Sequence, residues 1–341
     1  MQQYLLVMLA LSVSFFARAG NVTQATNDTQ NKGIKQHSDV AALQTAVEQN
    51  LRGPVKFGTQ PVNTYTVQQR LAYHKVPGIS FALIHKGAVS WAQGYGNVVA
   101  ASDQAVTVNT VFQAASIAKP VTAFAVMRMK DQGVIDINAD IATYLTSLIL
   151  AKGKQESETP VTFKNILDHS SGLTGGGYQG YEKGTAIPSD IQTFNGEAPA
   201  TSKAASVETT PGTLVRYSGA GYTLAEIALS DTFKQPFERV MDVWVLSQVG
   251  MQNSSFAMDY PQKDGIQVAL GHETSGKMID GSWRVHPEQA AAGLWSTPTD
   301  LAKLAIETSK AYKGQSKLLS QASAREMLAP VMPEQDLSEE F

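Results

Sequence analysis

Residues 110–123 read Thr-Val-Phe-Gln-Ala-Ala-Ser-Ile-Ala-Lys-Pro-Val-Thr-Ala and contain the only S-x-x-K tetrapeptide of the chain. Its ends are Ser116 and Lys119, near the start of a helical pattern over residues 115–132. Residues three apart share one face of a helix, so the Ser116 hydroxyl and the Lys119 ammonium can meet. A helix N-terminus also offers unpaired N–H groups to developing negative charge. The segment predicts a serine nucleophile with a lysine base; the alternative is a helix N-cap beside a surface charge.

The sequence around this segment predicts an α+β fold. Upstream, residues 79–84 and 88–95 have the pattern of a β-hairpin, preceded by a short helix over residues 66–74. Downstream, a Gly-rich middle is followed by helical stretches over residues 222–248 and 299–312. Strands that open the chain and helices that follow them are typical of the α+β class.

Composition excludes several classes of protein. The chain has 341 residues, 43% of them hydrophobic, and 27 Lys+Arg against 30 Asp+Glu, which gives a net charge of -3. It can therefore bury a core, and it has no basic surface for nucleic acid. The absence of cysteine rules out disulfides, iron–sulfur clusters and a cysteine nucleophile. His272 and His286 lie in polar loops without ligand partners at helical spacing, so we expect no metal and no cofactor.

The N-terminus has the pattern of a secretory leader. An apolar run from Tyr4 to Phe16 is too short to span a bilayer and is followed by Ala17-Arg18-Ala19, a small-residue cleavage site. The alternative is an uncleaved anchor. A leader of this kind predicts a periplasmic or secreted protein without a stable membrane span. The predicted organisation is a signal peptide over 1–19, a flexible linker over 20–37, a folded domain over 38–330 and a polar tail over 331–341.

Residues 110–123 resemble the nucleophile segment of the serine β-lactamase-like family, which groups class C β-lactamases, DD-carboxypeptidases and related esterases and D-aminopeptidases. The likeness continues in the family's order at 132–136 (Gln-Gly-Val-Ile-Asp), 166–173 (Ile-Leu-Asp-His-Ser-Ser-Gly-Leu), 211–213 (Pro-Gly-Thr), 217–222 (Tyr-Ser-Gly-Ala-Gly-Tyr) and 291–297 (Ala-Ala-Gly-Leu-Trp-Ser-Thr). Together these motifs cover about residues 75 to 330. The resemblance implies a β-lactamase/transpeptidase-like fold, in which an antiparallel sheet is flanked by a helical domain.

The resemblance also implies roles for individual residues. Ser116 is the expected acyl-accepting nucleophile, Lys119 its proton partner, and Tyr217 the phenol that relays protons and activates the deacylating water. Taken alone, Tyr217 is more typical of a structural tyrosine. An earlier Tyr95-Gly96-Asn97 matches the family's Y-x-N element by letters, but it lies upstream of the nucleophile. His169 belongs to a family landmark, and we expect it to be structural.

Two departures from the family pattern bear on activity. The third Y-x-N position is Gly219, a predicted substrate-binding position that lacks the amide with which the family holds a substrate's amide carbonyl. This favours esters over β-lactams, and we expect Gly219→Asn to shift the preference toward β-lactams. The family's K-T-G or H-x-G element has no counterpart between Trp295 and Phe341. The resemblance therefore implies a C-terminally incomplete domain without its last strands, with Ser116 as the one remaining oxyanion donor and with poor turnover.

Three hypotheses about function follow. The first is a secreted serine hydrolase that forms an acyl-enzyme on Ser116 and acts on esters, D-amino-acid peptides or β-lactams, a small-molecule or peptidoglycan-derived substrate. The second is a Ser-His-Asp hydrolase, although the nearest match to a G-x-S-x-G elbow, residues 78–82, is strand-like. The third is a catalytically silent penicillin-recognition or peptidoglycan-binding module. Turnover of an activated ester that is lost in Ser116→Ala would separate these hypotheses.

Overall fold

The computed structural model describes residues 40–53, 62–100, 102–150, 158–260 and 266–331. The predicted signal peptide and linker lie outside these residues, as does most of the polar tail. The chain divides into two compact units, residues 1–43 and 44–341, and the first contributes only helical residues 40–43 to the described part. Within the described ranges, no helix has both the length and the apolar character needed to cross a bilayer.

The N-terminal part of the second unit is a β-hairpin flanked by short elements. Strands β3 (Gly78–His85) and β4 (Ala88–Gly96) pair in antiparallel fashion, as the sequence predicts, with a bulge between Leu83 and Ile84. Lys86 and Gly87 both have positive φ, which matches the right-handed twist of the strands. The remaining elements here are β1 (Leu51–Arg52), β2 (Thr64–Tyr65) and α2 (Val67–His74), whose N-terminus is closed by a Thr66–Gln69 capping box.

Two helices form the centre of the hydrophobic core. Helix α3 (Ala118–Asp131) and helix α6 (Gly219–Phe233) are buried on nearly all sides, which explains why neither has a clear polar face. Pro236 separates α6 from the helices that follow, so the predicted helical stretch 222–248 is in fact interrupted. The smaller helical elements around this core are η1 (Ile141–Tyr144), α4 (Phe163–Leu167), α5 (Asp190–Asn195), α7 (Phe237–Met241), η2 (Asp242–Leu246) and α8 (Ser247–Val249).

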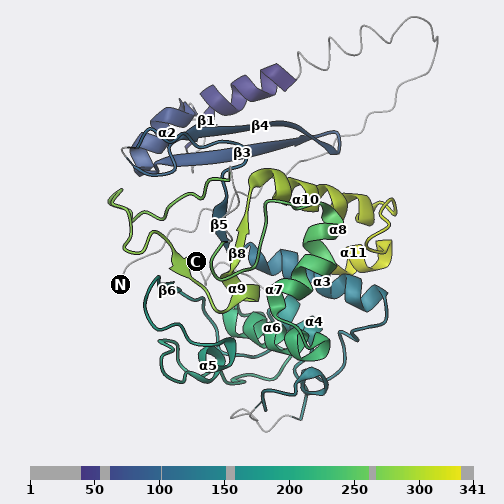
Figure 1. The fold of residues 1–341 in the computed structure, drawn as a ribbon. Coiled ribbons are helices and arrows are strands. Elements are labelled where there is room, and N and C mark those ends of the chain that lie inside the picture. Colours follow the sequence, from purple (N-terminus) through teal and green to yellow (C-terminus); the bar gives the residue numbers. More distant parts are fainter. Residues whose placement is uncertain (1–39, 54–61, 101, 151–157, 261–265, 332–341) are drawn as a thin grey trace, which may run out of the picture. The chain divides into compact units, whose positions relative to one another are not determined.

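A second pair of strands leads into α3. Strand β5 (Phe112–Ala115) pairs with β8 (Leu294–Ser296) in antiparallel register, with an irregularity between Gln113 and Ala115. Short helix α9 (Gln289–Ala292) directly precedes β8 and packs against both α3 and α6. Strands β6 (Tyr181–Glu182) and β7 (Arg284–Val285) form a further short pair. The end of β5 is therefore held between α9 and β8, next to the start of α3 (Figure 1).

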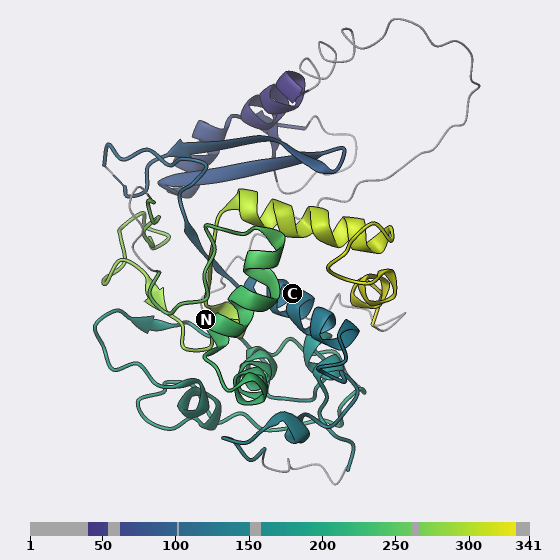
Figure 2. The same ribbon diagram turned by 45° about the vertical axis from the view of Figure 1, so that its right-hand side comes forward.

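The last two helices connect the hairpin to the core. Helix α10 (Pro298–Tyr312) lies along β3 and β4, whereas α11 (Gln321–Met327) packs against α3 and α10 (Figures 1 and 2). The sequence did not predict α11. Ser320 caps this helix, and the Asp131 carboxylate at the end of α3 accepts hydrogen bonds from the Ser320 backbone N–H and hydroxyl (2.6 and 2.8 Å). The described residues after α10 contain no strand.

Candidate active site

The turn between β5 and α3 presents Ser116. Ala115 has a φ of 44°, a left-handed conformation that ends the strand, and Ser116 and Ile117 form a turn before the helix. The Lys119 backbone N–H donates to the Ser116 carbonyl (3.1 Å) and closes this turn. The helix therefore begins three residues later than the sequence predicts, with Lys119 as its second residue. Ser116 is half-buried, while Ile117 beside it is exposed.

The structure brings Ser116, Lys119 and Tyr217 together. Tyr217 Oη donates a hydrogen bond of 2.6 Å to Ser116 Oγ, and Lys119 Nζ donates one of 3.2 Å to the same oxygen. Lys119 Nζ also lies 4.7 Å from the centroid of the Tyr217 ring. Tyr217 is 40% exposed and Lys119 only 5%, so the hydroxyl pair faces solvent and the amine lies beneath it. This is the arrangement of a nucleophile in contact with two proton-transfer groups.

Lys119 is held in a buried environment. Its ammonium donates to the Ala291 carbonyl (2.8 Å) and lies 5.6 Å from the centroid of the Tyr222 ring. Burial lowers the pKa of Lys119, and Tyr217 and the Glu288 carboxylate oppose this shift in part. A lysine in this position gives up its proton more readily than a solvated one, as a general base must.

The Ala291 carbonyl is itself positioned by a buried acid that sequence reasoning missed. Glu226, which is 2% exposed in α6, accepts a hydrogen bond from the Ala290 backbone N–H in α9 (2.8 Å). Burial raises the pKa of Glu226 well above its usual range; the nearby Asp190 adds to the shift and the backbone donors oppose it. The sequence contains one signal for a buried acid at this position: Glu226 is the single acidic residue inside the apolar run over residues 222–229.

Gly219 has no room for a side chain. It is the first residue of α6, and a Cβ there would lie 2.9 Å from Tyr178 Cε2 and 3.0 Å from the Gly176 carbonyl oxygen. Tyr178 therefore occupies the volume that a larger residue at 219 would need. Its own hydroxyl accepts a hydrogen bond from Thr223 Oγ1 (3.1 Å). Tyr178 could not be predicted from a local pattern, because its contact with Gly219 is purely tertiary.

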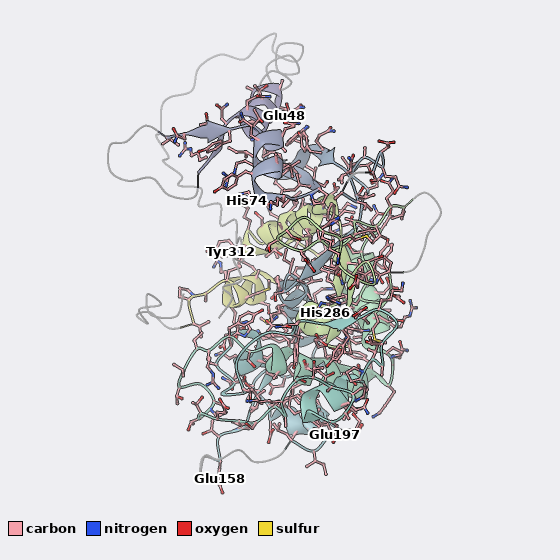
Figure 3. The ribbon with its side chains drawn as sticks, turned by 90° about the vertical axis from the view of Figure 1, so that its left-hand side faces the viewer. Glu48, His74, Glu158, Glu197, His286 and Tyr312 are labelled. Carbon is pink, nitrogen blue, oxygen red and sulfur yellow. The ribbon has the colours of Figure 1, made fainter. Side chains whose placement is uncertain are left out.

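Tyr95, His272 and His286 have hydrogen-bond partners other than Ser116. The Tyr95 hydroxyl donates to Glu48 Oε1 (2.8 Å) rather than to Ser116. Figure 3 shows His74 at the end of α2 and His286 among the helices, well separated. His286 Nδ1 contacts Glu288 Oε1 (2.9 Å), and His272 Nε2 accepts the Ala100 backbone N–H (3.1 Å). Within the described part of the chain, no three His, Asp or Glu residues are grouped as metal ligands.

Comparison with known proteins identifies the family. The β-lactamase family profile matches residues 64–341, and the chain therefore belongs to the β-lactamase family. It is 25% identical over 239 residues to the esterase EstB of Burkholderia gladioli, covering 68% of this chain and 60% of that protein. It is 26% identical over 239 residues to a β-lactamase of Pseudomonas fluorescens, covering 69% of this chain and 61% of that protein. The chain thus spans less than two thirds of the length of these relatives.

A solved structure shows the same fold. The octameric penicillin-binding protein homologue from Pyrococcus abyssi superposes with a TM-score of 0.62 at 23% identity, covering 79% of this chain and 60% of that one. The identity is low, so the likeness concerns the fold. The α+β, β-lactamase/transpeptidase-like fold class predicted from the sequence is confirmed.

Proposed function

We propose that this protein is a serine hydrolase that works through an acyl-enzyme on Ser116. One observation carries the proposal. Ser116 Oγ lies within hydrogen-bond distance of both the Tyr217 hydroxyl (2.6 Å) and the Lys119 amine (3.2 Å). The membership in a family that includes an esterase and a β-lactamase supports hydrolysis as the reaction class.

The proposed reaction has two halves. First, the Ser116 hydroxyl gives its proton to neutral Lys119 while Oγ bonds to the substrate's carbonyl carbon; the Ser116 backbone N–H is our candidate donor to the oxyanion. The carbonyl carbon then loses its bond to the leaving oxygen, which takes up a proton through Tyr217. Second, water gives a proton to Tyr217 and attacks the acyl carbon. Ser116 Oγ leaves and recovers its proton from Lys119.

Esters are the proposed substrate class. A β-lactam or peptide substrate carries an amide that a side-chain amide of the protein can hydrogen-bond. Gly219 has no side chain with which to make this hydrogen bond. The Tyr178 ring fills the volume beside Gly219, so a neighbouring residue would have to take over that contact. Simple activated esters depend less on it.

A specific contact disfavours the Ser-His-Asp alternative. His169 Nδ1 accepts the Ser218 backbone N–H (3.2 Å), and the neighbouring Asp168 carboxylate accepts from the Ser170 hydroxyl (2.6 Å). A Ser-His-Asp mechanism needs a serine hydrogen-bonded to a histidine, which in turn is hydrogen-bonded to an acid. His169 and Asp168 have the other partners named above.

Hydrolysis of p-nitrophenyl acetate by the full chain tests the proposal. We expect turnover that is lost in Ser116→Ala and retained in Ser275→Ala, a matched control because Ser275 is exposed in a distant loop. Equal activity in the two variants would contradict the assignment of Ser116. A folded chain that binds a penicillin but hydrolyses neither ester nor β-lactam would favour the silent recognition module.

The proposed setting is outside the cytoplasm, with cleavage after Ala19, a linker to residue 37, the catalytic domain over 38–330 and a tail over 331–341. The support is the apolar segment from Tyr4 to Phe16 followed by small residues. Intact mass of the exported protein should lack residues 1–19. Retention of these residues on a membrane fraction would contradict the leader and favour an anchor.

A further inference from the structure

His169 holds the backbone on both sides of Tyr217. It follows α4 with a φ of 61°, a left-handed conformation that turns its carbonyl and its ring toward the same segment. The carbonyl accepts the Arg216 backbone N–H (2.8 Å), and Nδ1 accepts the Ser218 backbone N–H (3.2 Å). The two peptide N–H groups that flank the Tyr217 amide in the chain are thus bonded to one residue.

The His169 ring also lies against the Tyr217 ring. The two centroids are 4.7 Å apart with an interplanar angle of 37°, and the Tyr222 ring is 5.4 Å away on the same imidazole. Because Tyr217 is 40% exposed, it has few other side chains to fix its ring. The imidazole therefore restricts the rotation that would move the phenol away from Ser116 Oγ.

The imidazole is uncharged at neutral pH. Nδ1 accepts a backbone N–H, so the neutral ring carries its proton on Nε2. Burial, together with the positive charge of Lys119, lowers the pKa of His169 to about 4. The other titratable groups around it are Tyr217, Tyr222 and the adjacent Asp168. A protonated ring would present N–H to N–H at Ser218 and lose that bond.

We propose that His169 is a positioning residue, which uses a neutral imidazole and its own carbonyl to hold Tyr217 at hydrogen-bond distance from Ser116. The inference rests on the proposed function, in which Tyr217 transfers protons. His169 itself does not touch Ser116 in any described hydrogen bond, so it acts only through the tyrosine. A phenol displaced by about 1 Å loses the alignment that proton transfer needs, and such shifts typically cost about 100-fold in rate.

Two variants separate the contacts of the ring. His169→Asn keeps a side-chain acceptor and tolerates the left-handed backbone, but it removes the aromatic contact. His169→Phe keeps the ring and removes the acceptor. We expect kcat on p-nitrophenyl acetate to fall by about tenfold or more in each, with KM changed by less than about threefold. Thermal unfolding of each variant shows whether it is folded under the assay conditions.

A double-variant cycle distinguishes positioning from general support of the fold. If His169 acts through Tyr217, then His169→Asn lowers kcat in the native background but has no further effect in Tyr217→Phe. The same loss in both backgrounds would overturn the proposal. If His169→Asn proves too unstable, His169→Phe is carried through the same cycle, and its additive or non-additive loss decides the question.

A spectroscopic readout does not depend on turnover. With 3-fluorotyrosine placed at position 217, we expect one narrow ¹⁹F resonance in the native chain and a shifted or exchange-broadened one in His169→Asn. An unchanged resonance in the variant would overturn the positioning role. A chain that shows this ¹⁹F effect but no reaction at Ser116 would refute the proposed function and leave the positioning of Tyr217 supported.

Discussion

Helix α3 and the β3–β4 hairpin lie close together in the sequence but differ in how completely they are buried. In α3, 11 of 14 residues are buried, whereas no residue of β3 or β4 is fully buried. The hairpin has no third strand among the described residues, and an isolated two-stranded sheet is only marginally stable. Ser116 lies in the turn just before this well-packed helix, and Lys119 is the second residue of the helix. The difference indicates that the candidate active site depends on the helical core and much less on the hairpin.

The largest effect should come from the buried face of α3. Lys119→Met removes the proposed base and keeps an apolar chain of similar length at a buried position. Acylation should slow by about 10²–10⁴-fold, the usual contribution of a positioned proton-transfer group. Single-turnover kinetics with p-nitrophenyl acetate measure this step. An acylation rate within about twofold of the native chain would contradict the role of Lys119.

A core phenylalanine should be the next most sensitive position. Phe124 in α3 is 0% exposed, so Phe124→Ala leaves a cavity among residues that cannot easily collapse. We expect a loss of about 3–5 kcal/mol in the free energy of unfolding. Urea denaturation followed by tryptophan fluorescence measures it. A loss below about 1 kcal/mol would show that this core is less tightly packed than α3 implies.

Acid should lower the stability of the folded chain through His169. Its pKa is lowered to about 4, so below pH 6.5 the unfolded chain binds a proton that the folded chain does not, and stability falls until about pH 4. The loss is at most about 3 kcal/mol. Asp131 and Asp231, whose pKa values are lowered, lose their contributions only at still lower pH. Glu226 has the opposite effect: its pKa is raised in the folded chain, so its contribution to stability increases as the pH falls.

Comparison with His169→Asn isolates this contribution. Denaturation midpoints from pH 7 to pH 4 should fall less steeply in the variant than in the native chain. Parallel slopes in the two proteins would contradict the assignment of a neutral, buried imidazole.

Truncating a phenylalanine to alanine in the hairpin should have the smallest effect on the free energy of unfolding. Phe81 in β3 is half-buried and contacts the Tyr95 ring edge-on, with centroids 5.9 Å apart. Phe81→Ala should cost only about 1–2 kcal/mol, since it loses an aromatic pair and part of a buried surface. Urea denaturation alongside Phe124→Ala gives a matched pair of phenylalanine truncations. Equal losses at the two positions would remove the contrast between core and hairpin.

Local patterns predicted the elements whose signals are local. The hairpin and the short helix over residues 66–74 were both predicted, and the structure contains them as β3–β4 and α2. The start of α3 was placed too early because nothing in the sequence reveals the left-handed backbone at Ala115. Helix α11 is short and was missed, although its N-cap Ser320 is a local signal; the hydrogen bonds from Ser320 to Asp131 join residues that are distant in the sequence.

The candidate site shows the same division. Ser116, Lys119 and Tyr217 were predicted from ordered motifs, and the structure brings them together, although their catalytic roles remain a proposal. Glu226 and Tyr178 were not predicted. Glu226 acts through its hydrogen bond to α9, and the Tyr178 ring packs where a side chain at Gly219 would lie. The structure also bears on the expectation that Gly219→Asn shifts the preference toward β-lactams. A side chain there must displace the Tyr178 ring and press on the Gly176 carbonyl.

Covalent labelling tests whether Ser116 is the nucleophile of this protein. A fluorophosphonate should bond its phosphorus to Ser116 Oγ with loss of fluoride and add one label mass to the peptide that contains residue 116. We expect one adduct on the native chain and none on Ser116→Ala, while Ser275→Ala is labelled like the native protein. A folded, full-length chain that gains no mass, or that is labelled at another residue, would contradict it.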